Sequence, residues 1–541
     1  MHIRPLPLAG ALRLGRPSPI WFKPALSVVV SVAPPNLILL ALGRLDLAMY
    51  TMAGSLCALY AHNRPYAARA RTLAWVVLGM TGGLAVALIA ASLTTRALVL
   101  VTVGALLAAV QKAVCDATRV GPPGNVVLTF ITSASLFVPQ TLAQIPAHLG
   151  MTLAAGAWAW LVGMAPGLVR PHGPERRATA QALTAAAAHA ATGDAHTRGA
   201  AAAAVQAAWQ TLLTAGLRSD RTRRGLERLL VRAEVALAAP ADSDPGRLRA
   251  WARDLRGNGP LPRVDDLPGE AEELLGVEAE RTTRTPRHHH LTPLAVRTFV
   301  GCALAGYASL ALGVGRPYWA LVTAASLYQA NLTLTWSRAV QRVVGNVIGV
   351  LVFAAVVPLA HLHQAALVLL CLAFNFGAEA LIGRNYWLGT ICVTPMALLI
   401  TEFARFQDSA ELITERTVDT LVGALVGFVA AVAVTNRRSG DRLEHALTSA
   451  ERARERAARL LTEPHTAPAA LEAARRALAV ALVDLRGTTE AASGEWWQRA
   501  LPHDRVMLAE QAGHRTLAAT VRRQGLTLDR DDNARAEDVR P

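Results

Sequence analysis

Apolar residues gather in two blocks, 24–168 and 292–435, which enclose a polar stretch rich in Ala and Arg. A helix that crosses about 30 Å of hydrocarbon needs roughly 20 mostly apolar residues, because each residue advances the helix by about 1.5 Å. Five segments meet this requirement with little charge: 72–92, 97–117, 152–169, 343–360 and 364–382. The pattern therefore predicts helices that span a membrane.

Seven further apolar segments are interrupted by prolines or polar residues: 24–43, 45–61, 123–138, 293–312, 317–336, 386–401 and 418–434. Such interruptions are tolerated in a membrane where neighbouring helices or a wet cavity satisfy the freed backbone groups. The sequence thus predicts twelve spans, six in each block. We expect an all-α fold, a polytopic transmembrane helical bundle of two six-helix halves with cytoplasmic helical domains.

The polar segments that follow each block are also predicted to be helical. Ala-rich runs lie at 178–191 and 200–217, and amphipathic patterns at 221–238, 442–461 and 469–485. Because Ala buries little surface, these helices should pack against one another or against a second copy, so a homodimer through them is compatible with the pattern. A regulatory, dimerising or structural role would give the same pattern. The expected division is a first transmembrane half (1–170), a cytoplasmic helical domain (171–290), a second transmembrane half (291–436) and a cytoplasmic helical tail (437–541).

The basic residues predict the orientation in the membrane. The net charge is +15, but the basic side chains punctuate the apolar segments and form no patches interleaved with aromatic residues, so a nucleic-acid partner is not expected. One set of alternate loops is rich in Arg, whereas the opposite set holds only Arg44, Arg96, Arg316, Arg405 and Arg416. The positive-inside rule then places both termini and the central polar segment in the cytoplasm of a multi-pass cell-membrane protein. The N-terminus lacks a short apolar core with a small-residue cleavage site, so no removed signal peptide is expected.

Motifs for nucleotide, metal or nucleophilic chemistry are not found in the sequence. The five cysteines fall singly within predicted spans and are interpreted as packing residues. The adjacent histidines His288–His290 do not share a helix face, which favours a solvated linker over a metal site. No GxxxxGK[ST], no strand followed by GxGxxG and no GxSxG is present. We therefore expect no enzyme activity, no cofactor and no metal.

Two arginines open a glycine-containing span in the second block. Arg338 and Arg342 are four residues apart and share one helix face, and Gly345 and Gly349 continue nearly the same stripe. Small residues at this spacing allow close helix approach, and paired guanidinium groups suit a carboxylate. The alternative is that both arginines lie in the cytoplasmic headgroup zone and serve orientation alone.

Three short motifs occur in order within the second block. These are Arg338 and Arg342 with the two glycines, Asn385-Tyr386 followed by Thr394-Pro395, and the set Arg416, Asp419, Thr420 and Gly423. With these motifs the sequence resembles the fusaric acid resistance family of integral membrane transporters, whose relatives include bacterial aromatic carboxylic acid exporters. The first block echoes the arrangement faintly, with Arg69 and Arg71 before one span and Asn125 before Thr129 and Thr132, but lacks the Thr-Pro pair. We therefore expect the second half to provide most of the binding site.

Ionisable residues within spans are functional candidates, because a charge at the membrane centre costs about 2.5–3.5 kcal/mol on insertion scales. Glu379 is the candidate for proton coupling, although its side chain could instead reach water at the nearby cytoplasmic boundary. Arg416 and Asp419 are helical neighbours and could form a structural ion pair or an outer gate. Asn346 could contact substrate or bond between helices. Tyr318, Trp319, Tyr386 and Trp387 are interpreted as interfacial or packing aromatics rather than stacking partners for a substrate.

The resemblance implies an inner-membrane exporter of aromatic or other organic carboxylates, and the lack of a nucleotide motif favours the proton gradient as its energy source. The candidate substrate-binding residues are Arg338, Arg342, Asn346, Asn385, Thr394 and Pro395. The proline removes a backbone donor in mid-span and frees a carbonyl there. The expected partners are the lipid bilayer and a small organic anion. A passive organic-anion channel and a non-transporting membrane scaffold for envelope partners are the alternatives.

Overall fold

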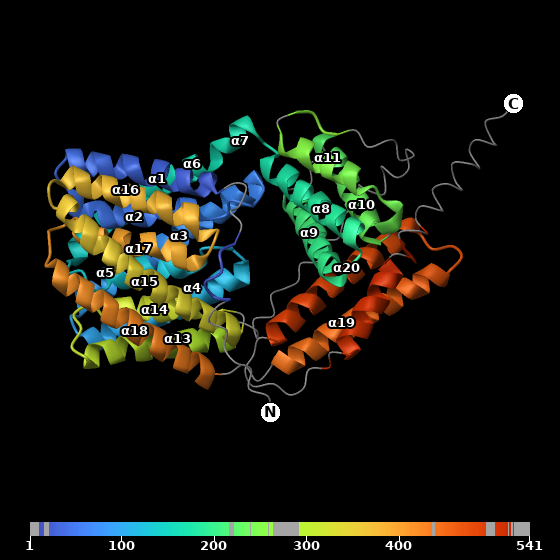
Figure 1. Cartoon of the computed structure of the whole chain (residues 1–541). Coiled ribbons are helices and arrows are strands. Elements are labelled where there is room, and N and C mark those ends of the chain that lie inside the picture. The colour runs from blue at the N-terminus through green and yellow to red at the C-terminus, as the bar shows by residue number, and fades with distance from the viewer. Residues whose placement is uncertain are drawn as a thin grey trace.

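A computed structural model describes residues 10–15, 21–215, 221–238, 240–257, 259–262, 292–329, 331–434, 439–493, 502, 504–517, 519, 520 and 523. All regular secondary structure in these ranges is helical. The helices form an apolar bundle and a group of polar helices beyond one end of it (Figure 1).

Eight helical stretches in the described residues are long and apolar enough to cross a membrane. They are α1 (Phe22–Ala41), α3 (Tyr66–Leu93), α4 (Ala97–Thr118), the run Leu142–Val169 that contains α6 (Ile145–Met164) and α7 (Pro166–Val169), α13 (Thr292–Ala311), α15 (Leu332–Ala360), α16 (Gln364–Ile382) and α18 (Ser409–Ala433). The expectation of an all-helical multi-pass membrane protein is thus supported.

Four further apolar helical stretches are shorter than a span: Leu45–Leu59 with α2 (Ala48–Ser55) at its centre, α5 (Val126–Ser135), α14 (Tyr318–Leu327) and α17 (Tyr386–Thr401). Each coincides with one of the interrupted segments of the sequence. Eight long and four short stretches match the expected twelve in position, but the short ones do not reach spanning length by themselves. Twelve spans in two six-helix halves therefore stay a prediction.

The short helices lie in the interior of the bundle. All residues of α14 are buried, and so are Ala48 and Tyr50–Ser55 of α2. Protein surrounds these helices, so the backbone groups at their ends do not need to face lipid. The length of each helix thus depends on its position in the bundle. A helix that faces lipid must cover the full hydrocarbon thickness, whereas a helix enclosed by protein can be shorter.

The two apolar blocks fold in the same order of long and short helices. In the first block α2 packs on α6 and α3 packs on α5, and in the second α14 packs on α18 and α15 packs on α17. Between the blocks α4 packs on α13 and α16 packs on α1, which are equivalent pairs under the same correspondence. Short apolar segments at corresponding positions of two repeats are a common location of binding sites in transporters. This arrangement directs attention to α5, α14 and α17.

The polar helices pack mainly on one another. They are α8 (Gly173–Thr192), α9 (Ala195–Thr214), α10 (Arg221–Ala238) and α11 (Pro245–Arg256), followed after the second block by α19 (Ser439–Thr462) and α20 (Pro468–Ser493). Asp194 and Asp244 cap the N-termini of α9 and α11 by accepting backbone hydrogen bonds. Helix α8 contacts α9, α10 and α11, so Ala-rich surfaces that bury little individually form a shared core.

A buried ionic network joins the central polar helices to the tail. Glu234 of α10 accepts a hydrogen bond from Trp209 Nε1 at 2.9 Å and is paired with Arg475 of α20. Arg475 also holds Glu472 through two hydrogen bonds of 2.6 and 2.8 Å, and Arg476 lies over the Trp209 ring. Burial alone would lower the pKa of Arg475, but Glu234 and Glu472 raise it. These satisfied charges connect α9, α10 and α20.

Glycines of α15 bring that helix into close contact with α17. A Cβ atom at Gly345 would lie 2.6 Å from the Trp387 carbonyl oxygen, and one at Gly349 would lie 3.0 Å from the Ile391 carbonyl oxygen. Backbone atoms cannot move aside as a flexible side chain can. The close approach that the Gly345 and Gly349 stripe predicts is confirmed.

We expect Gly345→Ala to lower the stability of the bundle by about 1–3 kcal/mol, because the added methyl group overpacks the contact with α17. Gly79→Ala in α3 is the matched control, since a Cβ there meets nothing within 4 Å. The control should be neutral or stabilising by about 0.5–1 kcal/mol, as usual for Gly→Ala inside a helix. Unfolding midpoints of the purified protein in detergent measure both, and equal shifts for the two variants would contradict the packing argument.

Candidate anion-binding site

Arg338 and Arg342 both engage one tyrosine on the neighbouring short helix. The Arg338 guanidinium lies over the Tyr386 ring, 4.0 Å from its centroid, and Arg342 Nη1 donates to the Tyr386 hydroxyl at 3.1 Å. Arg342 is only 3% exposed, and its Nε has no hydrogen-bond partner among the described residues. A role in the headgroup zone alone does not explain so deeply buried a guanidinium.

Asn346 continues the same face of α15 one turn deeper. It is buried, its Nδ2 donates to the Arg342 carbonyl at 2.8 Å, and its Oδ1 accepts from Thr394 Oγ1 at 2.9 Å. The next residue, Pro395, leaves the Ile391 carbonyl of α17 without its helical donor, and this carbonyl faces Gly349. Of the two interpretations of Asn346, the structure shows the interhelical hydrogen bond.

Asn385 caps α17 and holds an N-terminal segment of the chain. Its Nδ2 donates to the carbonyls of Ala11 and Arg13 at 3.1 and 3.0 Å. Gln341 Nε2 donates to the same Ala11 carbonyl at 2.7 Å, and Trp387 Nε1 donates to the Leu12 carbonyl at 3.3 Å. The amide of Asn385 is thus occupied by backbone, and it does not join Arg338 and Arg342 in one hydrogen-bonded cluster.

Arg416 and Asp419 do not form an ion pair in the described structure. Arg416 is 1% exposed and lies over the Trp319 ring, 4.0 Å from its centroid. Asp419, also buried, accepts a short hydrogen bond of 2.5 Å from Ser309 of α13. Asp419 therefore connects α18 to α13, while Arg416 faces the aromatic side chain of α14.

Aromatic side chains from both blocks meet beside Arg416. Trp319 stacks with Phe130 of α5 at 5.4 Å between ring centroids and lies 4.8 Å from the Tyr318 ring, which in turn contacts Phe137 at 5.7 Å. Trp319 is 1% exposed, so it is not an interfacial residue. The sequence interpretation missed Trp319 and Tyr386 as contact residues for arginines. Trp319 lies two residues after Pro317 and Tyr386 directly follows Asn385, and this position at the starts of two short helices is the signal that could have singled them out.

Glu379, the candidate for proton coupling, belongs to α16 and not to the helices that carry these arginines. It is half-buried on α16, and no hydrogen bond or ion pair within the described residues engages its carboxylate.

Polar residues of the first block form a separate network. Thr129 Oγ1 donates to Gln111 Oε1 at 2.9 Å, and Gln111 Nε2 donates to Thr132 at 3.3 Å. Asn125 Nδ2 donates to Thr129 at 3.2 Å. Gln111 was missed from the sequence because its partners lie on another helix.

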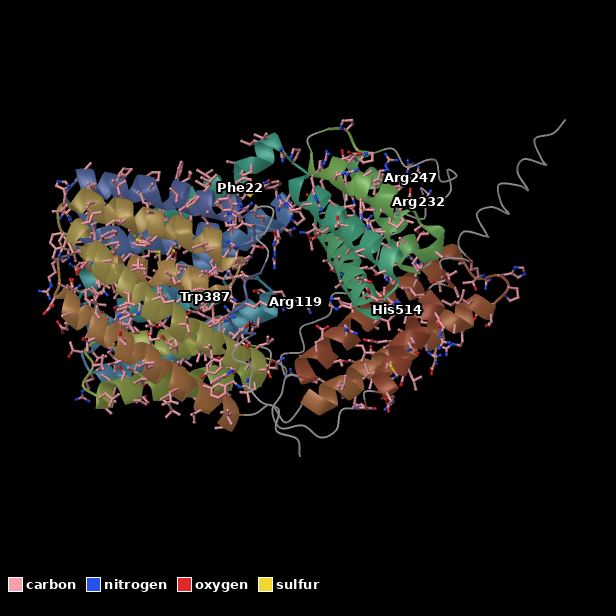
Figure 2. The ribbon with its side chains drawn as sticks, viewed as in Figure 1. Phe22, Arg119, Arg232, Arg247, Trp387 and His514 are labelled. Carbon is pink, nitrogen blue, oxygen red and sulfur yellow. The ribbon has the colours of Figure 1, made fainter. Side chains whose placement is uncertain are left out.

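The described residues contain no cluster of three or more His, Cys, Asp or Glu side chains that could hold a metal. The histidines His288–His290 lie outside the described residues. Figure 2 places Phe22 and Trp387 in the bundle, Arg232, Arg247 and His514 among the polar helices, and Arg119 at the end of the bundle that faces them.

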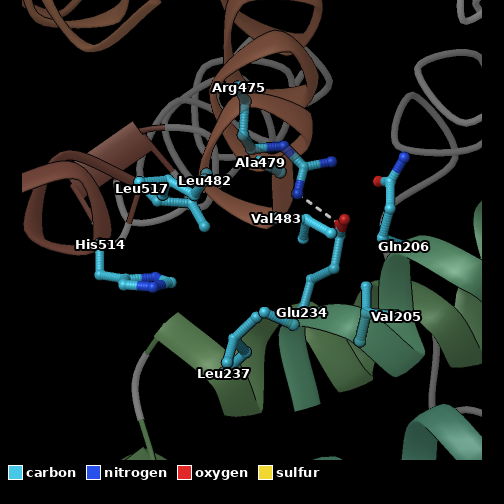
Figure 3. Close-up of a pocket in the computed structure, with 11 residues that line it drawn as sticks. Val205, Gln206, Glu234, Leu237, Arg475, Ala479, Leu482, Val483, His514 and Leu517 are labelled. Atoms are coloured by element: carbon cyan, nitrogen blue, oxygen red, sulfur yellow. Dashed lines mark hydrogen bonds and ion pairs between the residues drawn. The ribbon is translucent and has the colours of Figure 1, made fainter. Parts of the chain in front are cut away.

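A small cleft among the polar helices is a weaker candidate for anion binding. Glu234, Arg475, Gln206 and His514 contribute its polar side chains (Figure 3). Arg475 is already paired with two carboxylates, so it offers little to a further anion. Burial, together with nearby Arg198, His189 and Arg486, lowers the pKa of His514 to about 4, so its imidazole is neutral at physiological pH. The unpaired arginines of the bundle are the better site.

Comparison with known proteins adds a family assignment to this geometry. Residues 303–430 match the family model described as fusaric acid resistance protein-like. This part of the chain is therefore similar to fusaric acid resistance proteins. It extends from α13 to α18 and includes Arg338, Arg342, Tyr386 and Arg416, so the resemblance drawn from the motifs is confirmed. The family is of the membrane-transporter type.

Two curated bacterial proteins are similar to the chain. An uncharacterized membrane protein of Bacillus subtilis, YvaC, is 26% identical over 479 residues, which cover 79% of this chain and 74% of that protein. An uncharacterized protein of Haemophilus influenzae is 30% identical over 189 residues, which cover 34% of this chain but only 25% of that protein's length. No solved structure matches. The relative that matches along most of this chain is thus itself a membrane protein.

Thr394→Val tests the bond between α15 and α17. The substitution keeps the side-chain shape but leaves the buried Asn346 carbonyl oxygen without its donor, which costs about 1–3 kcal/mol. Thr401→Val on the same helix is the control, because Thr401 Oγ1 bonds only a carbonyl of its own helix, that of Leu398. Thermal unfolding should show a clear loss for the first variant and little change for the second, and the reverse order would contradict the assigned bond.

Proposed function

We propose that this protein exports organic carboxylates, aromatic ones included, across the cell membrane and uses the proton gradient to do so. One observation carries the proposal. Arg338 and Arg342 enter an apolar bundle without a carboxylate partner among the described residues, and they share only the Tyr386 ring and hydroxyl. A buried guanidinium that lacks a counter-ion is costly, and a two-oxygen anion is the ligand that fits its fork.

The geometry suggests how the anion would be received. The Tyr386 hydroxyl is a neutral acceptor for Arg342, so an incoming carboxylate offers a stronger, charge-assisted hydrogen bond at the same nitrogen. Arg338 is half-buried and lies nearer the start of α15, whereas Arg342 is buried one turn deeper. The two arginines would thus pass the anion inward from the end of the bundle to its interior.

The proposed topology has twelve spans in two six-helix halves, 1–170 and 291–436, with both termini, the polar helices of 171–290 and the tail of 437–541 in the cytoplasm. The alternating loop arginines support this orientation, since the Arg-rich loops include Arg119, at the end of the bundle that faces the polar helices (Figure 2). Binding of the anion from the cytoplasm follows, because Arg338 and Arg342 belong to the same set of loops. A homodimer through the polar helices stays a prediction.

The first test is efflux of radiolabelled aromatic acids from cells that express the chain. Arg338→Gln/Arg342→Gln should lower efflux by about 10-fold or more, the effect of losing charged hydrogen bonds worth about 1.5–3 kcal/mol. Arg384→Gln, an exposed arginine beside the same helix ends, is the control for charge alone. Undiminished efflux in the double variant would exclude the arginine pair from the path.

A second test concerns the proton. Glu379→Gln should abolish the sensitivity of efflux to an uncoupler while it preserves exchange of labelled for unlabelled substrate, because exchange needs no net proton movement. Glu411→Gln, at an exposed position of α18, is the control. If wild-type efflux at clamped voltage is insensitive to the uncoupler, the protein is a passive anion channel. That result would also exclude Glu379 as a proton-coupling residue.

A further inference from the structure

Residues 11–15 form a strap that connects α15 to the start of α17. The Ala11 carbonyl accepts two hydrogen bonds, one from Gln341 Nε2 of α15 at 2.7 Å and one from Asn385 Nδ2 at 3.1 Å. Because Asn385 is the N-cap of α17, a single backbone oxygen of the strap joins the two helices. The helices cannot separate at this end while both bonds are intact.

Further hydrogen bonds hold the next residues of the strap. The Leu12 carbonyl accepts from Trp387 Nε1 at 3.3 Å, and the Arg13 carbonyl accepts from Asn385 Nδ2 at 3.0 Å. Together with Ala11, three successive carbonyl groups of the strap are bound by side chains of α15 and of the start of α17. The bundle thus binds the backbone of the strap rather than its side chains.

The strap is held mainly by polar bonds and buries little apolar surface. Its Gly15 N–H donates to the Arg384 carbonyl at 2.8 Å. Arg13 and Gly15 are exposed and Leu14 is 53% exposed, whereas Ala11 is only 4% exposed. Water can replace such hydrogen bonds, so each contributes less than the burial of a large apolar side chain. The strap can therefore dissociate while the bundle stays folded.

The strap lies beside the arginine pair. Gln341 directly precedes Arg342, and Asn385 directly precedes Tyr386, the residue that both arginines contact. Arg342 is 3% exposed, so an anion reaches it only if the surrounding contacts open. The strap also occupies the Asn385 amide, which is a candidate for substrate binding.

We propose that the strap is an autoinhibitory closure of the arginine pair. While it is bound, the cytoplasmic approach to Arg342 is closed; when it dissociates, an anion can enter and the Asn385 amide is free to bind it. The inference rests on the proposed function and its topology, and it adds a regulatory step. Only molecules whose strap is released bind the anion, so the apparent affinity is reduced by the fraction that is released.

Two glycine substitutions test whether the strap can be released. A Cβ atom at Gly15 would lie 2.9 Å from the Arg384 carbonyl oxygen, whereas a Cβ at Gly10 would meet nothing within 4 Å. Trypsin must extract the strap to cut after Arg13, so the cleavage rate follows the released population. In the purified full chain in lipid nanodiscs, Gly15→Ala should be cut about 3–10-fold faster than wild type, as expected for the loss of one hydrogen bond. Gly10→Ala, the matched control, should be cut at the wild-type rate.

A second variant weakens the strap without touching its own residues. Trp387→Phe keeps an aromatic ring but removes the donor to the Leu12 carbonyl, so trypsin should again cut faster. Trp75→Phe is the control, because Trp75 is 73% exposed on α3, far from the strap in sequence. Cleavage at the wild-type rate in both Gly15→Ala and Trp387→Phe would refute the strap.

Modification of Arg342 by phenylglyoxal tests whether the strap covers the arginine pair. Mass spectrometry of the same nanodisc samples should show faster modification of Arg342 in Gly15→Ala and Trp387→Phe than in wild type. Arg475, which is buried and paired with carboxylates in the polar helices, should react at one rate in all samples. If trypsin shows release but Arg342 reacts at the wild-type rate, the strap does not close the site and the inference is wrong.

Transport kinetics test the autoinhibition itself. Inside-out vesicles present the cytoplasmic face to radiolabelled aromatic acids of known concentration. Gly15→Ala should lower the KM by about 3–10-fold at unchanged kcat, because a larger fraction of the protein is open to the anion. Gly10→Ala should keep the wild-type KM. An unchanged KM in Gly15→Ala, in a sample whose strap trypsin shows to be released, would exclude autoinhibition.

The outcomes separate the two proposals. If Gly15→Ala exposes Arg342 to phenylglyoxal but neither it nor the wild type transports a carboxylate, the proposed function fails while the closure by the strap stands. If the wild type transports carboxylates and loses this activity with Arg338 and Arg342, but Gly15→Ala changes neither the modification of Arg342 nor the KM, only the strap is refuted.

Discussion

The structure depends on one constraint: backbone polar groups in hydrocarbon must be satisfied by the protein itself. Long helices such as α3 and α15 meet this constraint alone and face outward, as the exposed Trp75 and Leu351 show. The short helices α14 and α17 meet it only because other helices enclose them. Helix ends, with their free polar groups and adjoining loops, are thereby carried into the bundle, and a site can form there without exposing polar backbone to lipid.

The candidate site uses these inner helix starts to hold aromatic side chains against arginines. Tyr386 is the first residue of α17 and meets Arg338 and Arg342, and Trp319 is the second residue of α14 and meets Arg416. Both contacts place a ring face on a guanidinium, which partly offsets the cost of burial without neutralising the charge. In the proposed function, a charge that is held in this way, without a paired carboxylate, receives the anion.

The polar helices accommodate a buried arginine differently, by pairing it with carboxylates. Arg475 is buried, like Arg342 and Arg416 of the bundle, but it is held by Glu234 and Glu472, so its charge is compensated. That network fastens the tail to the central helices. At the bundle, Asn385, Gln341 and Trp387 fasten residues 11–13 across the starts of α15 and α17 by bonds to backbone carbonyls. Segments far apart in the sequence are therefore fixed to one another both among the polar helices and at the starts of α15 and α17.

The sequence by itself determined the two apolar blocks, the helical polar segments and the family motifs, because these follow from composition and spacing along a single helix. The stripe of Arg338, Arg342, Gly345 and Gly349 is such a feature, since helical periodicity alone places it on one face. Only the tertiary structure decided which partners these residues meet. Tyr386, Trp319 and Ser309 come from other helices, so no spacing in the sequence could show that Asp419 binds Ser309 rather than Arg416. Pairing across helices depends on packing direction and depth, which a one-dimensional pattern does not contain.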